Sequence, residues 1–185
     1  MLRMLILATC AGFALEFVAG DAVVALFALW PLQAGFLPWQ VLSYAFLHAS
    51  ASHLVFNMLG LWMFGRALQD ALGGAALLAL YVAGVLSAAV TQLLVSSFSA
   101  EVYPTVGASG GVFGLLLAYG VCFPRRIILL LIPPIPLPAW LAVILYAGVE
   151  LVMGVSGTEA KVAHFAHLGG MLGAWLVLRR WRRSR

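Results

Sequence analysis

Charged side chains are scarce in this sequence. They make up 9% of its 185 residues, whereas ordinary globular domains carry about 25%. Hydrophobic residues account for 64% of the chain, which is more apolar surface than a soluble protein of this size could bury. This composition argues against a soluble enzyme and predicts an all-α, polytopic membrane protein. We expect a single membrane-embedded domain over residues 1–185, with no room for an appended soluble domain.

Cysteines and metal-binding patterns are also rare. The only two cysteines, Cys10 and Cys122, lie in apolar surroundings, which favours free thiols over a disulfide. The histidines offer a metal site as one interpretation, but the sequence has no HExxH motif and no nearby set of cysteines or acids. We therefore expect no metal site. The histidines in question are His48, His53, His164 and His167.

Most of the basic residues lie in two clusters beside apolar segments. Of the ten Lys and Arg residues, seven belong to Arg125-Arg126 and to the run RRWRRSR at 179–185. Such clusters indicate the orientation of membrane helices rather than a phosphate-binding face. The net charge of +4 therefore does not indicate nucleic acid as a partner. The expected surroundings are a lipid bilayer.

Six apolar segments fit transmembrane helices, which need roughly 20 mostly apolar residues. Between the first two lies segment 20–51, which is broken by Pro31, Gly35 and Pro38 and predicts a re-entrant or surface-lying loop. Glu16 interrupts the first apolar run, so we expect a retained helix rather than a cleaved signal peptide. The predicted spans are 2–19, 52–68, 73–97, 105–123, 136–154 and 163–180.

Six spans place both termini on one side of the membrane. On that assumption nine of the ten basic residues fall on the side of the termini, and Lys161 alone falls opposite. The positive-inside rule then places both termini in the cytoplasm. We expect a multi-pass protein of a bacterial cytoplasmic membrane.

A serine and a histidine stand in similar glycine-rich surroundings. Ser109 lies in VGASGGVFG and His167 in AHFAHLGG, about five and four residues below the outer ends of their spans. At 1.5 Å per residue, both lie roughly 6–8 Å below the outer surface. Small residues such as Gly110 and Gly170 more often serve helix packing, and such packing would also bring the serine and histidine together as nucleophile and base.

His53 and Asn57 reach the same layer from the second span. Their i, i+4 spacing puts both on one helical face. One interpretation is a pair that joins helices by hydrogen bonds. The other is a pair of donors for a developing oxyanion, acting with the backbone N–H of Ser109.

Taken together, these motifs resemble the rhomboid family of intramembrane serine proteases. The segments FLHASASHLVFNMLGLWMFG, GASGGVFG, PRR…PPIP and AHFAHLGG occur in the family's order. The resemblance implies a six-helix core, Ser109 as nucleophile and His167 as general base, with His53 and Asn57 in oxyanion-stabilising positions. It also implies transmembrane protein substrates, no cofactor, and segment 20–51 as the family's first loop. The residues expected to support the site are Gly107, Ala108, Gly110, Phe113 and Gly170.

The chain departs from the family pattern at two places. Gln69 and Asp70 stand where a glutamate is expected after the second span, and Phe113 replaces a tyrosine found in some relatives while keeping a face to stack on the histidine. Two alternatives to a protease remain. One is a catalytically inactive relative that binds membrane proteins. The other is a small transporter, although the sequence shows no inverted repeat.

We further expect a dyad without a carboxylate to orient His167. Glu16 and Glu150 are ionisable residues within spans, and such residues are functional candidates. Nothing in their spacing connects them to Ser109, however, and His164 is interpreted as structural.

Overall fold

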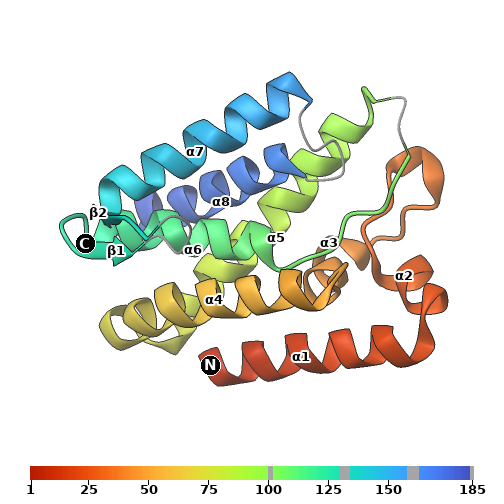
Figure 1. Ribbon diagram of the computed structural model, residues 1–185, viewed down its shortest axis with the longest axis horizontal. Helices are drawn as coiled ribbons and strands as arrows, with labels where there is room; N and C mark the ends of the chain where they lie inside the picture. Colours follow the sequence, from red (N-terminus) through yellow and green to blue (C-terminus); the bar gives the residue numbers. More distant parts are fainter. Residues whose placement is uncertain (100–101, 130–133, 158–162, 184–185) are drawn as a thin grey trace.

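The computed structural model describes residues 1–99, 102–129, 134–157 and 163–183. Lys161, which the count of basic residues assigns to the outer side, lies outside the described residues, as does Arg185. The described chain is almost entirely helical (Figure 1). Its elements are α1 (Leu2–Ala19), α2 (Asp21–Phe27), η1 (Leu32–Ala34), α3 (Gln40–Ser43), η2 (Tyr44–Phe46), α4 (Ala51–Leu72), α5 (Gly74–Ser96), α6 (Ser109–Cys122), β1 (Ile127–Leu129), β2 (Pro136–Pro138), α7 (Ala139–Ser156) and α8 (His164–Arg183).

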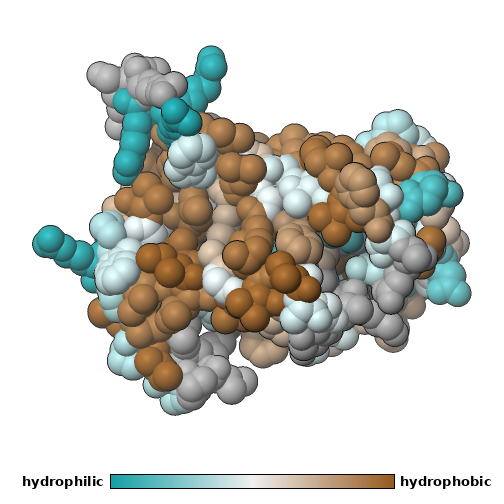
Figure 2. Space-filling model, turned by 90° about the horizontal axis from the view of Figure 1, so that it is seen from above, coloured by the Kyte–Doolittle hydropathy of each residue, from teal (hydrophilic) through white to brown (hydrophobic). Residues whose placement is uncertain are grey.

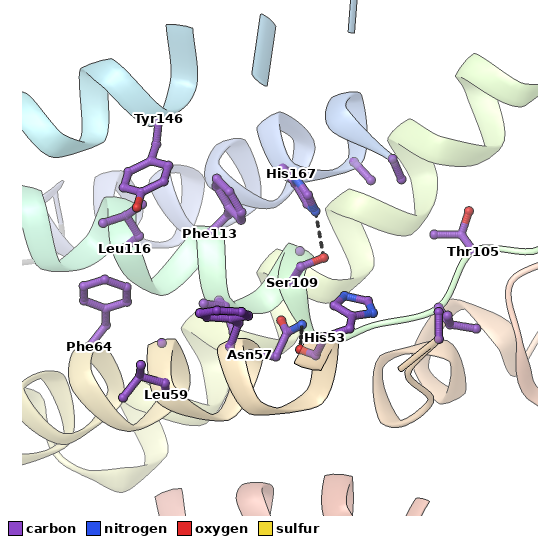
Figure 3. A pocket seen from close by; sticks show the side chains of 18 of the residues that line it. His53, Asn57, Leu59, Phe64, Thr105, Ser109, Phe113, Leu116, Tyr146 and His167 are labelled. Atoms are coloured by element: carbon purple, nitrogen blue, oxygen red, sulfur yellow. Dashed lines mark hydrogen bonds between the residues drawn. The ribbon is translucent and has the colours of Figure 1, made fainter. Parts of the chain in front are cut away.

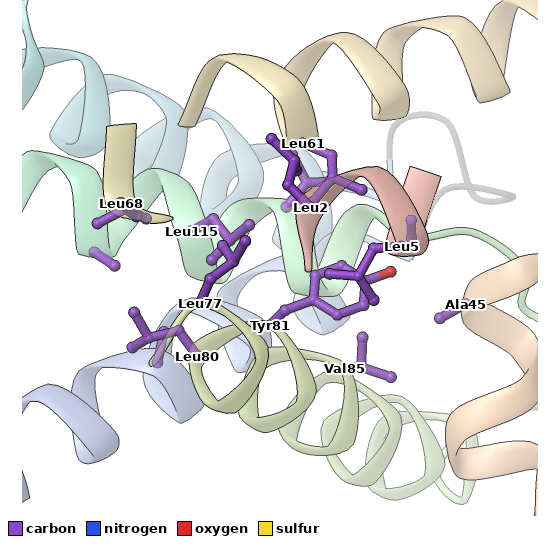
Figure 4. Packing of buried hydrophobic residues seen from close by; sticks show 14 of the residues in the cluster. Leu2, Leu5, Ala45, Leu61, Leu68, Leu77, Leu80, Tyr81, Val85 and Leu115 are labelled. Carbon is purple, nitrogen blue, oxygen red and sulfur yellow. The ribbon is translucent and has the colours of Figure 1, made fainter. Parts of the chain in front are cut away.

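Helix α6 forms the centre of the bundle. It packs against α4, α5, α7 and α8, and Figure 1 shows it enclosed by them. Eight of its 14 residues are buried. Leucines of α4, α5 and α6 pack together in one hydrophobic cluster. Figure 4 shows Leu61 of α4 and Leu77 of α5 beside Leu115 of α6. Helix α6 is therefore anchored in the hydrophobic core.

Much of the outer surface is apolar. Figure 2 shows hydrophobic side chains over the middle of the visible face and hydrophilic ones mainly toward its two ends. On α7, large side chains such as Ile144, Val152 and Val155 are more than half exposed. A surface of this kind suits the hydrocarbon of a bilayer.

Three described helices, α1, α5 and α7, are long and apolar enough to cross a membrane, and α6 is apolar but shorter. The six helices α1, α4, α5, α6, α7 and α8 lie at the positions of the six predicted spans, to within a few residues at each end. That all six cross the membrane stays a prediction. Figure 1 places the N-terminus and the end of α8 toward the same end of the bundle.

Segment 20–51 contains no helix longer than seven residues, so it holds no spanning helix, as predicted. A buried amide organises the segment, because Gln40 Oε1 accepts hydrogen bonds from the backbone N–H groups of Trp30 and Leu37 at 3.2 and 3.1 Å. The hydroxyl of Tyr44 donates to the carbonyl of Val85 on α5 at 2.8 Å. These bonds attach the segment to the bundle.

Two predicted helix starts are wrong. Helix α6 begins at Ser109 rather than at residue 105, because Thr105 pairs with Leu29 in a β-bridge and Gly107 has a φ of 127°. Helix α7 begins at Ala139 rather than at 136, because residues 136–138 form an antiparallel pair with 127–129. In both cases a short extended segment precedes the helix.

Candidate active site

Ser109 is the first residue of α6, not one turn into a helix as the sequence predicted. The chain before it turns sharply at Gly107, whose N–H donates to the carbonyl of Tyr44 at 3.0 Å. A side chain at Gly107 would have to adopt a left-handed backbone, and its Cβ would lie 2.7 Å from Cε1 of His53. Because the first N–H groups of a helix have no intrahelical acceptor, the backbone at Ser109 offers donors to a bound group.

His167 lies in the first turn of α8 and contacts the serine directly. Its Nε2 is 2.8 Å from Ser109 Oγ, and Figure 3 shows the two side chains pointing toward each other. His167 is buried, with 9% of the residue exposed. Phe113 stacks on it with ring centroids 4.3 Å apart and planes within 4°. Phenylalanine at this position therefore provides the expected stacking face.

Glycines allow α6 and α8 to pack closely just after Ser109 and His167. A Cβ on Gly170 would collide with the carbonyl oxygen of Gly110, and one on Gly110 would collide with Ala88 of α5. A Cβ on Gly84 of α5 would lie 3.0 Å from the same Gly110 oxygen. The predicted close approach of these helices is present, and it depends on the missing side chains.

Asn57 and His53 on α4 face the same site. Asn57 Nδ2 donates to the carbonyl of His53 at 2.9 Å. Figure 3 shows both residues beside Ser109, on the side away from His167. The structure thus brings together the four residues that the sequence singled out for catalysis.

Ala108 and His48 support this arrangement. Ala108 is fully buried, and its N–H donates to Nε2 of His48 at 3.4 Å. Burial, and to a lesser degree the neighbouring His53 ring, lower the pKa of His48 to about 4. The His48 ring is therefore neutral and can act as an acceptor. Sequence reasoning considered this histidine only as a metal ligand.

The candidate site opens into a cavity of about 800 Å³. Its wall is mostly apolar and comes from α4, α6, α7 and α8 and from the extended segments beside them. Figure 3 shows Phe64 of α4 and Tyr146 of α7 on opposite sides of this space. The lining includes Thr105 before α6 and Leu129 of β1, and its mostly apolar side chains suit an apolar ligand.

The expectation that no carboxylate approaches His167 is wrong. Glu150 Oε2 lies 2.9 Å from Nδ1 of His167, within ion-pair distance, and makes a well-aligned hydrogen bond of 2.7 Å with Nδ1 of His164. Spacing along the sequence could not reveal which face of α7 meets α8. Two signals were present, however: a glutamate inside an apolar span, and an i, i+3 pair of histidines on one face.

A metal ion is a second possible explanation for this cluster. Among the described residues, one donor atom each of Glu150, His164 and His167 lies within 4.8 Å of the others. Donor atoms around a tetrahedral zinc ion are about 3.3 Å apart. The carboxylate oxygen is closer than that to both ring nitrogens, at 2.7 and 2.9 Å. These distances fit a hydrogen bond with His164 and an ion-pair contact with His167 better than a shared metal ion.

Comparison with known proteins gives a consistent family match. Residues 36–183 match the Rhomboid domain family. The chain is 33% identical over 138 residues to "Rhomboid protein 1, mitochondrial" of Saccharomyces cerevisiae, covering 72% of this chain and 39% of that protein. It is 30% identical over 141 residues to "Rhomboid protease GluP" of Bacillus subtilis, covering 75% and 25%. With "Rhomboid protease GlpG" of Yersinia pestis it shares 30% identity over 166 residues, covering 86% and 55%.

The chain spans between a quarter and about half of the length of these relatives. The family match nevertheless covers most of the chain. The apolar helices agree with it and make this a multi-pass integral membrane protein. The chain belongs to the rhomboid family.

Proposed function

We propose that this protein is an intramembrane serine endopeptidase with Ser109 as nucleophile and His167 as general base. The observation that carries the proposal is the 2.8 Å contact between His167 Nε2 and Ser109 Oγ at the wall of an apolar cavity. A serine hydroxyl is a weak nucleophile at neutral pH unless a base accepts its proton. Two of the similar proteins are named rhomboid proteases, which supports the same reaction here.

The chemistry follows from this contact. Ser109 Oγ attacks the scissile carbonyl carbon while its proton passes to Nε2 of His167. Collapse of the tetrahedral intermediate breaks the C–N bond, and His167 returns the proton to the leaving amine. Water then attacks the acyl-enzyme with His167 again as base, and collapse of this second intermediate breaks the ester C–O bond while His167 returns the proton to Ser109 Oγ. The proton transfers in these steps use only the His167 side chain.

The oxyanion of the intermediate needs donors that are already in place. The backbone N–H of Ser109 at the helix start is one candidate. Asn57 is a second, because an amide nitrogen carries two hydrogens and its bond to the His53 carbonyl uses one of them. His53, with its ring against Gly107, is a third.

The mostly apolar lining of the cavity favours a transmembrane segment as substrate, bound in extended form. A peptide bond in a helix is shielded by its own turn, so the segment must unwind before Ser109 can reach it. Apolar walls would accept its side chains, and residues that weaken a helix, such as glycine, would lower the cost of unwinding by about 1 kcal/mol each. The proposed substrates are therefore membrane proteins cleaved in or near their transmembrane segments.

We place the protein in a bacterial cytoplasmic membrane, with both termini in the cytoplasm. Nine of ten basic residues lie on the side of the termini when six helices cross the membrane. The common end occupied by the N-terminus and the end of α8 in Figure 1 is compatible with this orientation.

The direct test is cleavage of a reporter transmembrane substrate by the purified protein in detergent. Ser109→Ala should abolish cleavage and covalent labelling by a fluorophosphonate, which reacts with an activated serine hydroxyl and releases fluoride. Ser97→Ala is the matched control, because Ser97 is exposed at the end of α5 and bonds only locally to the Leu93 carbonyl. It should behave as the parent protein.

Two outcomes would contradict the proposal. Cleavage that persists in a folded Ser109→Ala variant would exclude Ser109 as nucleophile. Absence of both cleavage and labelling in the parent protein would favour a catalytically inactive relative that only binds membrane proteins, or a transporter.

A further inference from the structure

Glu150 lies where a third catalytic-site residue would be expected, but on a different helix from the serine and the histidine. Its side chain belongs to α7, whereas Ser109 begins α6 and His167 lies in the first turn of α8. Glu150 is buried, with 8% of the residue exposed, and its Oε2 lies 2.9 Å from Nδ1 of His167. The opposite ring nitrogen, Nε2, faces Ser109 at 2.8 Å. Serine, imidazole and carboxylate therefore form a continuous chain of polar contacts.

The helix packing explains how α7 delivers this carboxylate. Gly154 lies one turn after Glu150, on the same face of α7. A Cβ at Gly154 would lie 3.1 Å from the ring of Phe165 and 3.3 Å from Cβ of His164. The missing side chain lets the two helices approach at this level, which brings Glu150 to the start of α8.

His164 anchors the carboxylate. Its Nδ1 and Glu150 Oε2 are 2.7 Å apart and well aligned, and the two histidine rings stand nearly perpendicular, at 89°. One oxygen thus faces two ring nitrogens, one on each histidine. A buried carboxylate is costly unless it is paired, and this double contact supplies the pairing.

We propose that Glu150 is a positioning residue for His167, with His164 holding its carboxylate in place; this role rests on the proposed protease function. The carboxylate fixes the tautomer that carries a proton on Nδ1 and leaves Nε2 free to accept the proton of Ser109. When that proton arrives, the imidazolium is stabilised by the adjacent negative charge. The carboxylate remains unprotonated throughout, as in other serine proteases with an acidic third residue.

The test separates charge from shape. Glu150→Gln keeps the size and one acceptor oxygen but removes the charge, so kcat should fall by about 10²–10⁴-fold while KM stays within about threefold. Glu150→Asp restores the charge and should recover at least about tenfold of the lost kcat. Reporter cleavage in detergent measures both parameters.

Glu16→Gln is the matched control. Glu16 also lies within a long apolar helix, but its Oε2 accepts from a backbone N–H, that of His48, at 2.9 Å. An amide oxygen can accept the same bond, so kcat should stay within about twofold of the parent. A loss confined to Glu150→Gln then reports on the charge beside His167 rather than on carboxylates in membrane helices generally.

A second measurement needs no variant at Glu150. Ring nitrogen-15 spectra of the parent protein, with the His167 signals identified by their loss in His167→Ala, should show Nδ1 protonated and Nε2 unprotonated. The Nε2-protonated tautomer would overturn the proposal. An unchanged kcat in Glu150→Gln would also overturn it. The same holds if Glu150→Gln loses kcat together with a lower melting temperature and Glu150→Asp does not recover that kcat. An inactive parent protein would instead contradict the protease function itself.

Discussion

Replacing Gly170 by alanine should push Ser109 and His167, the proposed nucleophile and base, apart. The new Cβ would collide with the carbonyl oxygen of Gly110 and would lie 2.7 Å from its carbonyl carbon. Ordinary contact begins at 3.4 Å, so α8 must move away from α6 by at least about 0.7 Å in this close-packed region. Moving the His167 ring by that amount would lengthen its 2.8 Å contact with Ser109 to about 3.5 Å, beyond hydrogen-bonding distance.

The expected result is a fall in kcat/KM of about 10²-fold, since misplacing reacting groups by about 1 Å has effects of this size. The protein should remain folded, because overpacking costs about 1–3 kcal/mol and the alanine returns up to about 1 kcal/mol in helix propensity. Reporter cleavage and thermal unfolding in the same detergent measure the two effects separately.

Gly148→Ala provides the control for a glycine-to-alanine change in a membrane helix. Gly148 lies on α7, and a Cβ there would have nothing within 4 Å. Its activity should equal that of the parent protein. If Gly170→Ala cleaved the reporter within threefold of Gly148→Ala, the glycine contact would not set the distance between Ser109 and His167, and the reasoning would be refuted.

Two further predictions concern the oxyanion and the topology. Asn57→Ala should lower kcat by about 10²–10³-fold if its amide holds the oxyanion, and an unchanged kcat would leave it only the bond to the His53 carbonyl. In a background with Cys10 and Cys122 replaced by serine, a membrane-impermeant thiol reagent should label Phe98→Cys on intact cells but Asp70→Cys only after lysis. Both positions are well exposed, and the reverse pattern would overturn the orientation.

The sequence predicted the bundle well because its signals are local. Apolar runs of about 20 residues placed the long helices to within a few residues, and the breaks at Pro31, Gly35 and Pro38 identified the segment without a spanning helix. The helix starts at 105 and 136 were wrong because the extended pairing there involves partners elsewhere in the chain. Hydrophobicity alone does not distinguish such a segment from the first turn of a helix.

The site was predictable where two motifs had complementary chemistry. Ser109 and His167 lie in glycine-rich segments at similar expected depth, and their contact is present. Glu150 was not placed because its contact depends on which face of α7 turns toward α8. That face is set by the close approach at Gly154, which only the three-dimensional packing reveals.

The 58 residues that separate Ser109 from His167 have a consequence for biosynthesis. Ribosomes add about 5–20 residues per second, so the serine is made about 3–12 s before the histidine. During that interval the nascent chain carries Ser109 on α6 without His167, and the glycine contact with α8 cannot yet form. On the proposed mechanism, an unfinished chain therefore cannot hydrolyse a peptide bond, because Ser109 has no base until α8 has packed against α6.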